Sequence, residues 1–307
     1  MRSQNASIRS LAVGFVALGA ALRPVPARAC ACGCDAFDVQ TSAIMPTSTG
    51  ATAFLEMDAL DQNQNWSGGS KAPSDQNSDK QIRTGFFTLG AQYMFSRSWG
   101  VEGELPYWSR NFKTESGAGI GDFTHSAVGD ARVRAIYSGL SSDMSAGLTF
   151  GLKLPTGDMS APDFDRDTQP GTGSTDALLG GYETGVHERW GWFADAELDE
   201  PALIAAGYRP GAEIDGAAGA YARGWTIGGV EVEPLAQAVA SWRWRDSGPA
   251  ADSADTGFRR LAAGPGVQVN AGLWGAFATV AFPIDQYYNG NQLAAPELWK
   301  LMLTRKF

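Results

Sequence analysis

The 307-residue sequence predicts an all-β fold: a single transmembrane, antiparallel, up-and-down β-barrel of the outer-membrane type with about twelve strands. Three observations support this prediction. Segments of about ten residues alternate apolar and polar side chains, and the connections between them alternate between short and long. The sequence also ends in an alternating segment whose last residue is Phe307. A period of two is typical of β-strands.

Composition excludes several function classes. Charged residues make up 19% of the chain and the formal net charge is -9, which argues against a nucleic-acid partner because such a partner requires a basic face. After the first 29 residues, no run approaches the roughly 18 consecutive apolar residues that a membrane-spanning helix needs. Strands of a membrane barrel carry only alternating hydrophobicity, so the average composition conceals them.

The first 29 residues predict a cleaved export signal. Arg2 and Arg9 supply the positive start, residues 11–22 the apolar run, and Ala27-Arg28-Ala29 the small-x-small cleavage site. We expect cleavage after Ala29, which would leave Cys30 first in the mature chain. Acylation of Cys30 is the alternative that this position leaves open. Export from the cytoplasm of a Gram-negative bacterium leads to the periplasm or the outer membrane, and the barrel pattern predicts the outer membrane.

Residues 30–50 predict a periplasmic segment that contains all three cysteines, Cys30, Cys32 and Cys34. Thiolates at this spacing are ligands for a soft ion, so copper or zinc binding is one interpretation. A local disulfide with one thiol left over is the other. The sequence predicts no other cofactor.

The predicted barrel occupies 51–307. Its expected strands are 51–59, 83–95, 99–110, 127–138, 145–154, 176–187, 192–199, 214–223, 226–244, 258–272, 275–284 and 297–307. An even number of strands places both ends of the barrel on the same side, so the last strand is expected to pair with the first. In the last strand, Trp299, Leu301, Leu303 and Phe307 are expected to face lipid, and Lys300, Thr304 and Lys306 the lumen.

The polar faces of the strands predict the lumen. Pairing 99–110 with 127–138 places Glu102 opposite Arg134 and Glu104 opposite Arg132, and opposite charges stabilise neighbouring strands. These ion pairs either brace the wall or line a pore. Twelve strands lie between the filled eight-stranded barrel and the wide porin, which favours a narrow conduit. The predicted lumen-lining residues are Glu102, Glu104, Arg132, Arg134, Lys153, Glu231, Glu233, Arg243 and Arg245.

Three passages resemble a known family. Gly129-Asp130 opens one predicted strand, Leu154-Pro155-Thr156-Gly157-Asp158 ends the next, and 171–176 reads Gly-Thr-Gly-Ser-Thr-Asp. This pattern is similar to that of outer-membrane proteins of the meta-pathway of phenol degradation. The resemblance implies an outer-membrane barrel that passes small, often hydrophobic, compounds. The last strand likewise resembles the C-terminal strand of outer-membrane barrels, which implies that Phe307 is the barrel-closure signal read by the assembly machinery.

The sequence therefore predicts a channel or transporter for small hydrophobic or aromatic solutes, acting by passive diffusion. One alternative is copper capture or uptake through the cysteine segment. Another is a lipid-acting barrel enzyme that uses His125 or His187, although we expect no enzyme. The acidic loop with Asp158, Asp163, Asp165 and Asp167 is expected to be solvated. Its alternative role is Ca²⁺ binding or bridging to lipopolysaccharide, which with outer-membrane lipid is an expected partner. The identity of the solute, the oligomeric state and whether the lumen is plugged stay open.

Overall fold

The computed structural model describes residues 43–307, which form a closed antiparallel barrel of 12 strands. These strands are β1 (Gly50–Gln62), β4 (Asp79–Met94), β5 (Trp99–Ser116), β7 (Ala131–Tyr137), β8 (Ala146–Leu154), β9 (Thr175–His187), β10 (Trp190–Leu203), β11 (Glu213–Ala222), β13 (Val230–Arg243), β14 (Phe258–Ala271), β15 (Trp274–Ala294) and β16 (Leu298–Lys306). Each pairs with its neighbours, and β1 pairs with β16 to close the barrel. The predicted fold class is confirmed.

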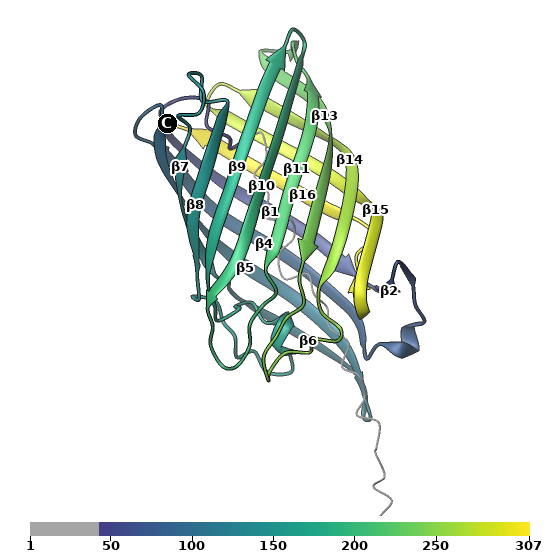
Figure 1. Cartoon of the computed structure of the whole chain (residues 1–307). Coiled ribbons are helices and arrows are strands. Elements are labelled where there is room, and N and C mark those ends of the chain that lie inside the picture. Colours follow the sequence, from purple (N-terminus) through teal and green to yellow (C-terminus); the bar gives the residue numbers. More distant parts are fainter. Residues whose placement is uncertain (1–42) are drawn as a thin grey trace, which may run out of the picture.

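The two ends of the barrel differ, and we call them the turn end and the loop end. At the turn end, where the chain terminates, short connections join β4 to β5, β9 to β10 and β14 to β15. At the loop end, longer segments such as 155–174 and 244–257 gather around the opening (Figure 1). The strands cross between these ends with a strong tilt (Figure 1), as closure of a barrel requires.

Strand β16 shows why these segments form a barrel wall. Its alternate residues Trp299, Leu301 and Leu303 are about half exposed, whereas Lys300 and Thr304 are buried. The outward positions of β16 are thus apolar, and its inward positions combine Lys300 and Thr304 with the buried Leu298 and Met302. An apolar outer face is typical of barrels that cross a membrane. The facing predicted for these residues is confirmed. Lys306 differs: it is exposed at the rim, where its Nζ contacts Thr47 Oγ1 at 3.3 Å.

Additional elements extend the loop end beyond the predicted strands. They are β2 (Gln64–Gly68), β3 (Ser70–Lys71), β6 (Gly119–Val128), η1 (Ser74–Gln76) and η2 (Arg166–Thr168), while β12 (Trp225–Ile227) lies at the turn end. The predicted loops 113–125 and 285–296 are largely strand, in the β5–β6 hairpin and in β15. Backbone pairing can continue outside a lipid layer with polar residues on both faces, so these extensions lack the alternating hydrophobic signal.

The long strand predicted over 226–244 is divided at its start. Gly228 and Gly229 have φ values of 60° and 85°, and they form the turn between β12 and β13. Only glycine adopts such conformations readily, so the pair marks a hairpin. Within residues 43–307, no helix is both long and apolar enough to cross a membrane.

Candidate functional site: the barrel lumen

The middle of the lumen contains ion-pair networks that reach between strands. Arg134 on β7 is the centre of the first. Its Nη1 donates to Glu104 Oε2 at 2.6 Å and lies 3.4 Å from Glu102 Oε1, and both carboxylates belong to β5. Its Nε and Nη2 each donate at 2.8 Å to the carboxylate of Glu197 on β10. Arg134 therefore connects β5 to β10 across the interior.

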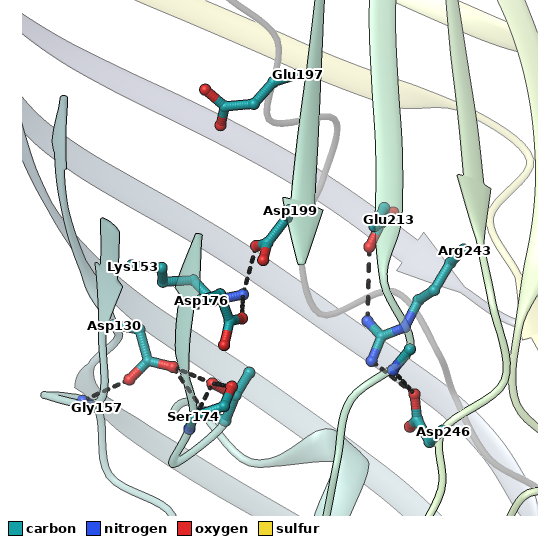
Figure 2. Close-up of polar contacts among 12 residues, drawn as sticks. Asp130, Lys153, Gly157, Ser174, Asp176, Glu197, Asp199, Glu213, Arg243 and Asp246 are labelled. Atoms are coloured by element: carbon teal, nitrogen blue, oxygen red, sulfur yellow. Dashed lines mark hydrogen bonds and ion pairs between the residues drawn. The ribbon is translucent and has the colours of Figure 1, made fainter. Parts of the chain in front are cut away.

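Three further cations make similar bridges, and Figure 2 shows two of them, Lys153 and Arg243. Lys153 Nζ on β8 lies 2.6 Å from a carboxylate oxygen of Asp176 and 2.6 Å from one of Asp199. Arg243 on β13 pairs with Glu213 at 3.7 Å and with Asp246 at 3.1 Å. On the seam, Lys300 pairs with Glu56 at 2.7 Å and Asp58 at 3.3 Å. Each of these cations thus pairs with two carboxylates.

The strand register explains which of these contacts are local. Glu102 lies opposite Arg134, and Glu104 opposite Arg132, so the predicted cross-strand pairing of β5 with β7 is confirmed. On β10 and β11 the register instead sets carboxylate against carboxylate. Glu197 faces Asp215, and Asp199 faces Glu213. Like charges directly opposite are destabilising, so this wall depends on cations from other strands.

At the turn end, the lumen is apolar and occupied. Buried side chains of the barrel form a cluster there that includes Met94, Ile136, Tyr182 and Phe193, and Met45 packs into this cluster. Ile44 packs into a neighbouring buried cluster, and its carbonyl accepts a hydrogen bond of 3.0 Å from Gln92 Nε2. The residues just before β1 therefore enter the barrel. Residues 43–49 belong to the predicted 30–50 segment, whose insertion the sequence does not indicate.

At the loop end, a second apolar zone lies inside the wall. Phe86 and Trp108 meet edge to face with ring centroids 4.7 Å apart, within a buried group that includes Leu60. Ile82, Phe112 and Leu293 form the adjoining buried group. The charged middle of the lumen thus lies between two apolar zones.

Loop 155–174 folds over this second zone. Its residues from Asp167 to Gly171 are buried, and Arg110 of β5 donates a hydrogen bond to the carbonyl of Thr168. The Arg166 guanidinium stacks 4.3 Å from the ring centroid of Tyr208 in the next loop, and the Tyr208 hydroxyl donates to Asp246 Oδ2 at 2.6 Å. Three loops are therefore connected at this opening.

Residues of the family-like passages form one hydrogen-bonded cluster at the base of that loop. Asp130 Oδ1 accepts a hydrogen bond from the Gly157 amide at 2.9 Å, and Oδ2 accepts from the Thr172 amide at 2.7 Å and hydroxyl at 2.6 Å (Figure 2). A Cβ on Gly157 would lie 2.7 Å from Gly171 Cα, so the backbones touch and no side chain fits. The motif residues at this base hold the loop, whereas Asp176, the last residue of the third passage, lies on β9 and pairs with Lys153 in the lumen.

The two histidines lie at opposite ends of the barrel. His125 on β6 contacts Asp158 of loop 155–174 at 3.0 Å, at the loop end. His187 is the last residue of β9, lies at the turn end and is exposed. Hydrogen bonds from the Ser160 amide and hydroxyl, with a contribution from His125, hold the pKa of Asp158 below its usual value. No site in residues 43–307 combines three His, Cys, Asp or Glu side chains in a way that could hold a metal.

The structure places most predicted lumen residues on the inward faces. Buried residues are Glu102, Arg132, Arg134, Lys153, Glu233 and Arg243; Glu104 and Glu231 are half-buried. Arg245 differs, because β13 ends at Arg243 and Arg245 is exposed, donating to Asn289 Oδ1 at 3.2 Å. The cysteines Cys30, Cys32 and Cys34 lie outside the described residues.

Sequence reasoning missed several charged residues of the lumen. They are Glu56, Asp58, Asp176, Asp195, Glu197, Asp199, Glu213, Asp215 and Arg260. Their alternation with outward apolar residues was the available signal, since all except Glu213 occupy inward positions of predicted strands. Glu213 lies one residue before the predicted strand 214–223. Which cation each carboxylate meets could not be read from that alternation.

No family model matches the chain, and no curated protein matches it. Among solved structures, the fold is similar to that of an outer membrane channel from Pseudomonas putida F1. The TM-score is 0.65 and the identity 14%, over 88% of this chain and 100% of that one. It also matches the β domain of the Bordetella autotransporter BrkA (TM-score 0.49, 13% identity, 85% and 100% coverage) and the CymD monoaromatic hydrocarbon channel (0.42, 8%, 84% and 89%). At these identities the likeness concerns the fold of an outer-membrane barrel alone.

Proposed function

We propose that this chain is an outer-membrane channel of a Gram-negative bacterium that passes small hydrophobic or aromatic solutes by passive diffusion. The loop end faces the medium and the turn end the periplasm. The export signal predicted over 1–29 and the resemblance of the last strand to the C-terminal strands of outer-membrane barrels support this location. The outward apolar side chains of β16 and its neighbours support contact with lipid.

The observation that carries the proposal is the arrangement of the lumen. Apolar zones lie at both ends, one around Phe86 and Trp108 and the other around Met94 and Phe193. Transfer of an apolar solute from water into such a zone is favourable by roughly 25 cal/mol per Å² of buried surface. Each zone would therefore concentrate solute at its own end.

The charged middle of the lumen is the barrier that a solute must cross between the two apolar zones. Its cations already pair with carboxylates, as Arg134 does with Glu104 and Glu197, so a polar solute gains little by entering. An apolar solute can cross only where these side chains or residues 43–46 leave space. The conduit is therefore narrow and selects small molecules, consistent with a barrel of 12 strands.

Flux into vesicles tests the proposal. The purified barrel is inserted into vesicles with a lipopolysaccharide outer leaflet, and entry of toluene is compared with entry of a hexose. We expect the barrel to accelerate toluene entry well above protein-free vesicles and hexose entry far less. Replacement of Trp108 by Asp, which places a charge in the loop-end zone, should reduce toluene entry. Equal toluene entry with and without the barrel would overturn the proposal.

A further inference from the structure

Three rows of outward-facing side chains cross β1, β4, β5 and β6 near the loop end. The register aligns them strand by strand. The row nearest the loop end is polar, the next is made of small residues, and the third is apolar. In the order β1, β4, β5, β6 they are Asp61, Arg83, Asn111 and Thr124; Ala59, Gly85, Ser109 and Ser126; and Met57, Phe87, Tyr107 and Val128.

The row of small residues makes a hollow in the outer wall. It has a volume of about 560 Å³ and is lined by Ala59, Gly85 and Ser109, with Phe87 and Trp299 at its sides. The charged residues of its lining are Asp61, Arg83 and Glu297. Trp299 belongs to β16, where it lies directly beside Ala59. The absence of a side chain at Gly85 is what leaves the space, since large side chains border it.

The polar row offers hydrogen-bonding groups on one side of the hollow. Arg83 Nε donates to Asp61 Oδ2 at 2.9 Å, which restrains the guanidinium. The Arg83 side chain is 62% exposed. Asn111 Nδ2 donates to Thr124 Oγ1 at 3.1 Å, so these amide and hydroxyl groups are also held in place.

The apolar row begins the lipid-facing band on the other side of the hollow. Below Phe87 the same face of β4 continues with Leu89, which is 61% exposed, and β16 continues with Leu301. The hollow therefore lies where acyl chains end and headgroups begin, if the barrel sits in the outer membrane as proposed above. Aromatic side chains such as Phe87 and Trp299 are common at that level.

We propose that this hollow binds the headgroup of a phosphorylated glycolipid of the outer leaflet, that is, of the lipopolysaccharide class. A sugar ring fills the space above Gly85 against the aromatic rings. Its hydroxyls meet Asn111 and Ser109, and its phosphate meets the Nη groups of Arg83, which suit a bidentate contact. The acyl chains lie along Phe87 and Leu301. A phospholipid has the phosphate and the chains but lacks a ring to fill the hollow.

This inference rests on the proposed outer-membrane location and is tested by lipid retention. The full barrel is purified in detergent, mixed with bis-phosphorylated lipid A or with phosphatidylglycerol, and examined by native mass spectrometry. We expect lipid A to be retained in preference to phosphatidylglycerol. Gly85→Trp, which fills the hollow, should abolish that retention, and Arg83→Gln should weaken it about tenfold, or roughly 1.4 kcal/mol.

The matched control is Ala91→Trp, which adds the same side chain to the same outward face of β4 within the apolar band. It should retain lipid A as the native chain does. A Cβ on Gly85 would lie 3.4 Å from the Phe87 ring, which is ordinary van der Waals contact, and heat-modifiable gel mobility verifies that each variant is folded. Equal retention by Gly85→Trp and the native chain, or equal retention of both lipids, would overturn the inference.

Solute flux separates this inference from the channel proposal. The hollow is on the outer wall, so Gly85→Trp should leave toluene entry unchanged. A barrel that retains lipid A but passes no solute contradicts only the channel. A barrel that passes solute but shows no preference for lipid A contradicts only the glycolipid site.

Discussion

Two walls of the same lumen neutralise their buried charges in different ways. On the wall of β5 and β7, each carboxylate lies opposite an arginine, as Glu102 lies opposite Arg134. On the wall of β10 and β11, carboxylates lie opposite carboxylates, as Glu197 lies opposite Asp215. The first wall is balanced by its own register. The second is balanced only when the barrel closes and brings Arg134, Lys153 and Arg243 within reach.

This difference indicates that the acidic wall depends on the rest of the barrel, whereas the β5–β7 wall does not. A buried carboxylate without a counter-ion costs several kcal/mol, so the cations that reach the acidic wall should dominate stability. The carboxylates that face each other on that wall should be individually dispensable, because each removal also relieves a like-charge contact. The predictions below test this asymmetry.

The largest effect is expected for Arg134→Met. It leaves Glu102, Glu104 and Glu197 without their shared cation in a buried setting, which should lower the free energy of unfolding by about 3–5 kcal/mol. Urea unfolding in lipid vesicles measures it. Arg189→Met, at an exposed turn-end position, is the control and should change stability by less than about 0.5 kcal/mol. Comparable losses for the two variants would refute the central role of Arg134.

A smaller loss is expected for Lys153→Met. Asp176 and Asp199 lose their cation, but the Asp199 side chain keeps 17% of its exposure and water can partly solvate it. We expect a loss of about 2–3 kcal/mol by the same unfolding measurement. Adding Asp199→Asn to Lys153→Met should restore part of it. A double variant less stable than Lys153→Met alone would contradict the dependence of this wall on its cations.

Removing one carboxylate from each wall sharpens the comparison. Asp215→Asn removes the charge facing Glu197 while its amide oxygen can still accept the hydrogen bond from Ser241, so stability should change by less than about 1 kcal/mol. Glu104→Gln takes a partner from Arg134 and should cost about 1–2 kcal/mol. If Asp215→Asn proves the more costly of the two, the walls do not differ as described.

The same contrast explains which features of the barrel the sequence predicts and which it does not. The alternation of apolar and polar residues along each segment was sufficient to predict the strands. It also predicted that residues such as Lys300 face inward, because successive side chains of a strand point to opposite faces. Register between adjacent strands was sufficient for Glu102 with Arg134. The contact of Arg134 with Glu197 spans β7 to β10, and no local pattern encodes it. The insertion of Ile44 and Met45 into the barrel was not predicted for the same reason, because it involves no strand pairing.

The smallest effect is expected on ion conduction, and it tests whether the acidic wall makes the lumen favour cations over anions. β10 and β11 present Asp195, Glu197, Asp199, Glu213 and Asp215 to the lumen, while cations such as Arg134, Lys153 and Arg243 come from other strands. Any residual conductance should therefore favour K⁺ over Cl⁻, because low-dielectric walls focus the field of fixed charges.

Replacing Asp215 by Asn should lower the K⁺/Cl⁻ permeability ratio about twofold, which corresponds to roughly 0.4 kcal/mol. Reversal potentials across planar bilayers in a KCl gradient measure that ratio. Glu188→Gln removes the same charge at an exposed position in a turn-end connection, outside the lumen, and should leave the ratio unchanged. If Glu188→Gln shifts the ratio as much as Asp215→Asn, the selectivity arises at the mouth. The β10–β11 wall would then act on stability alone.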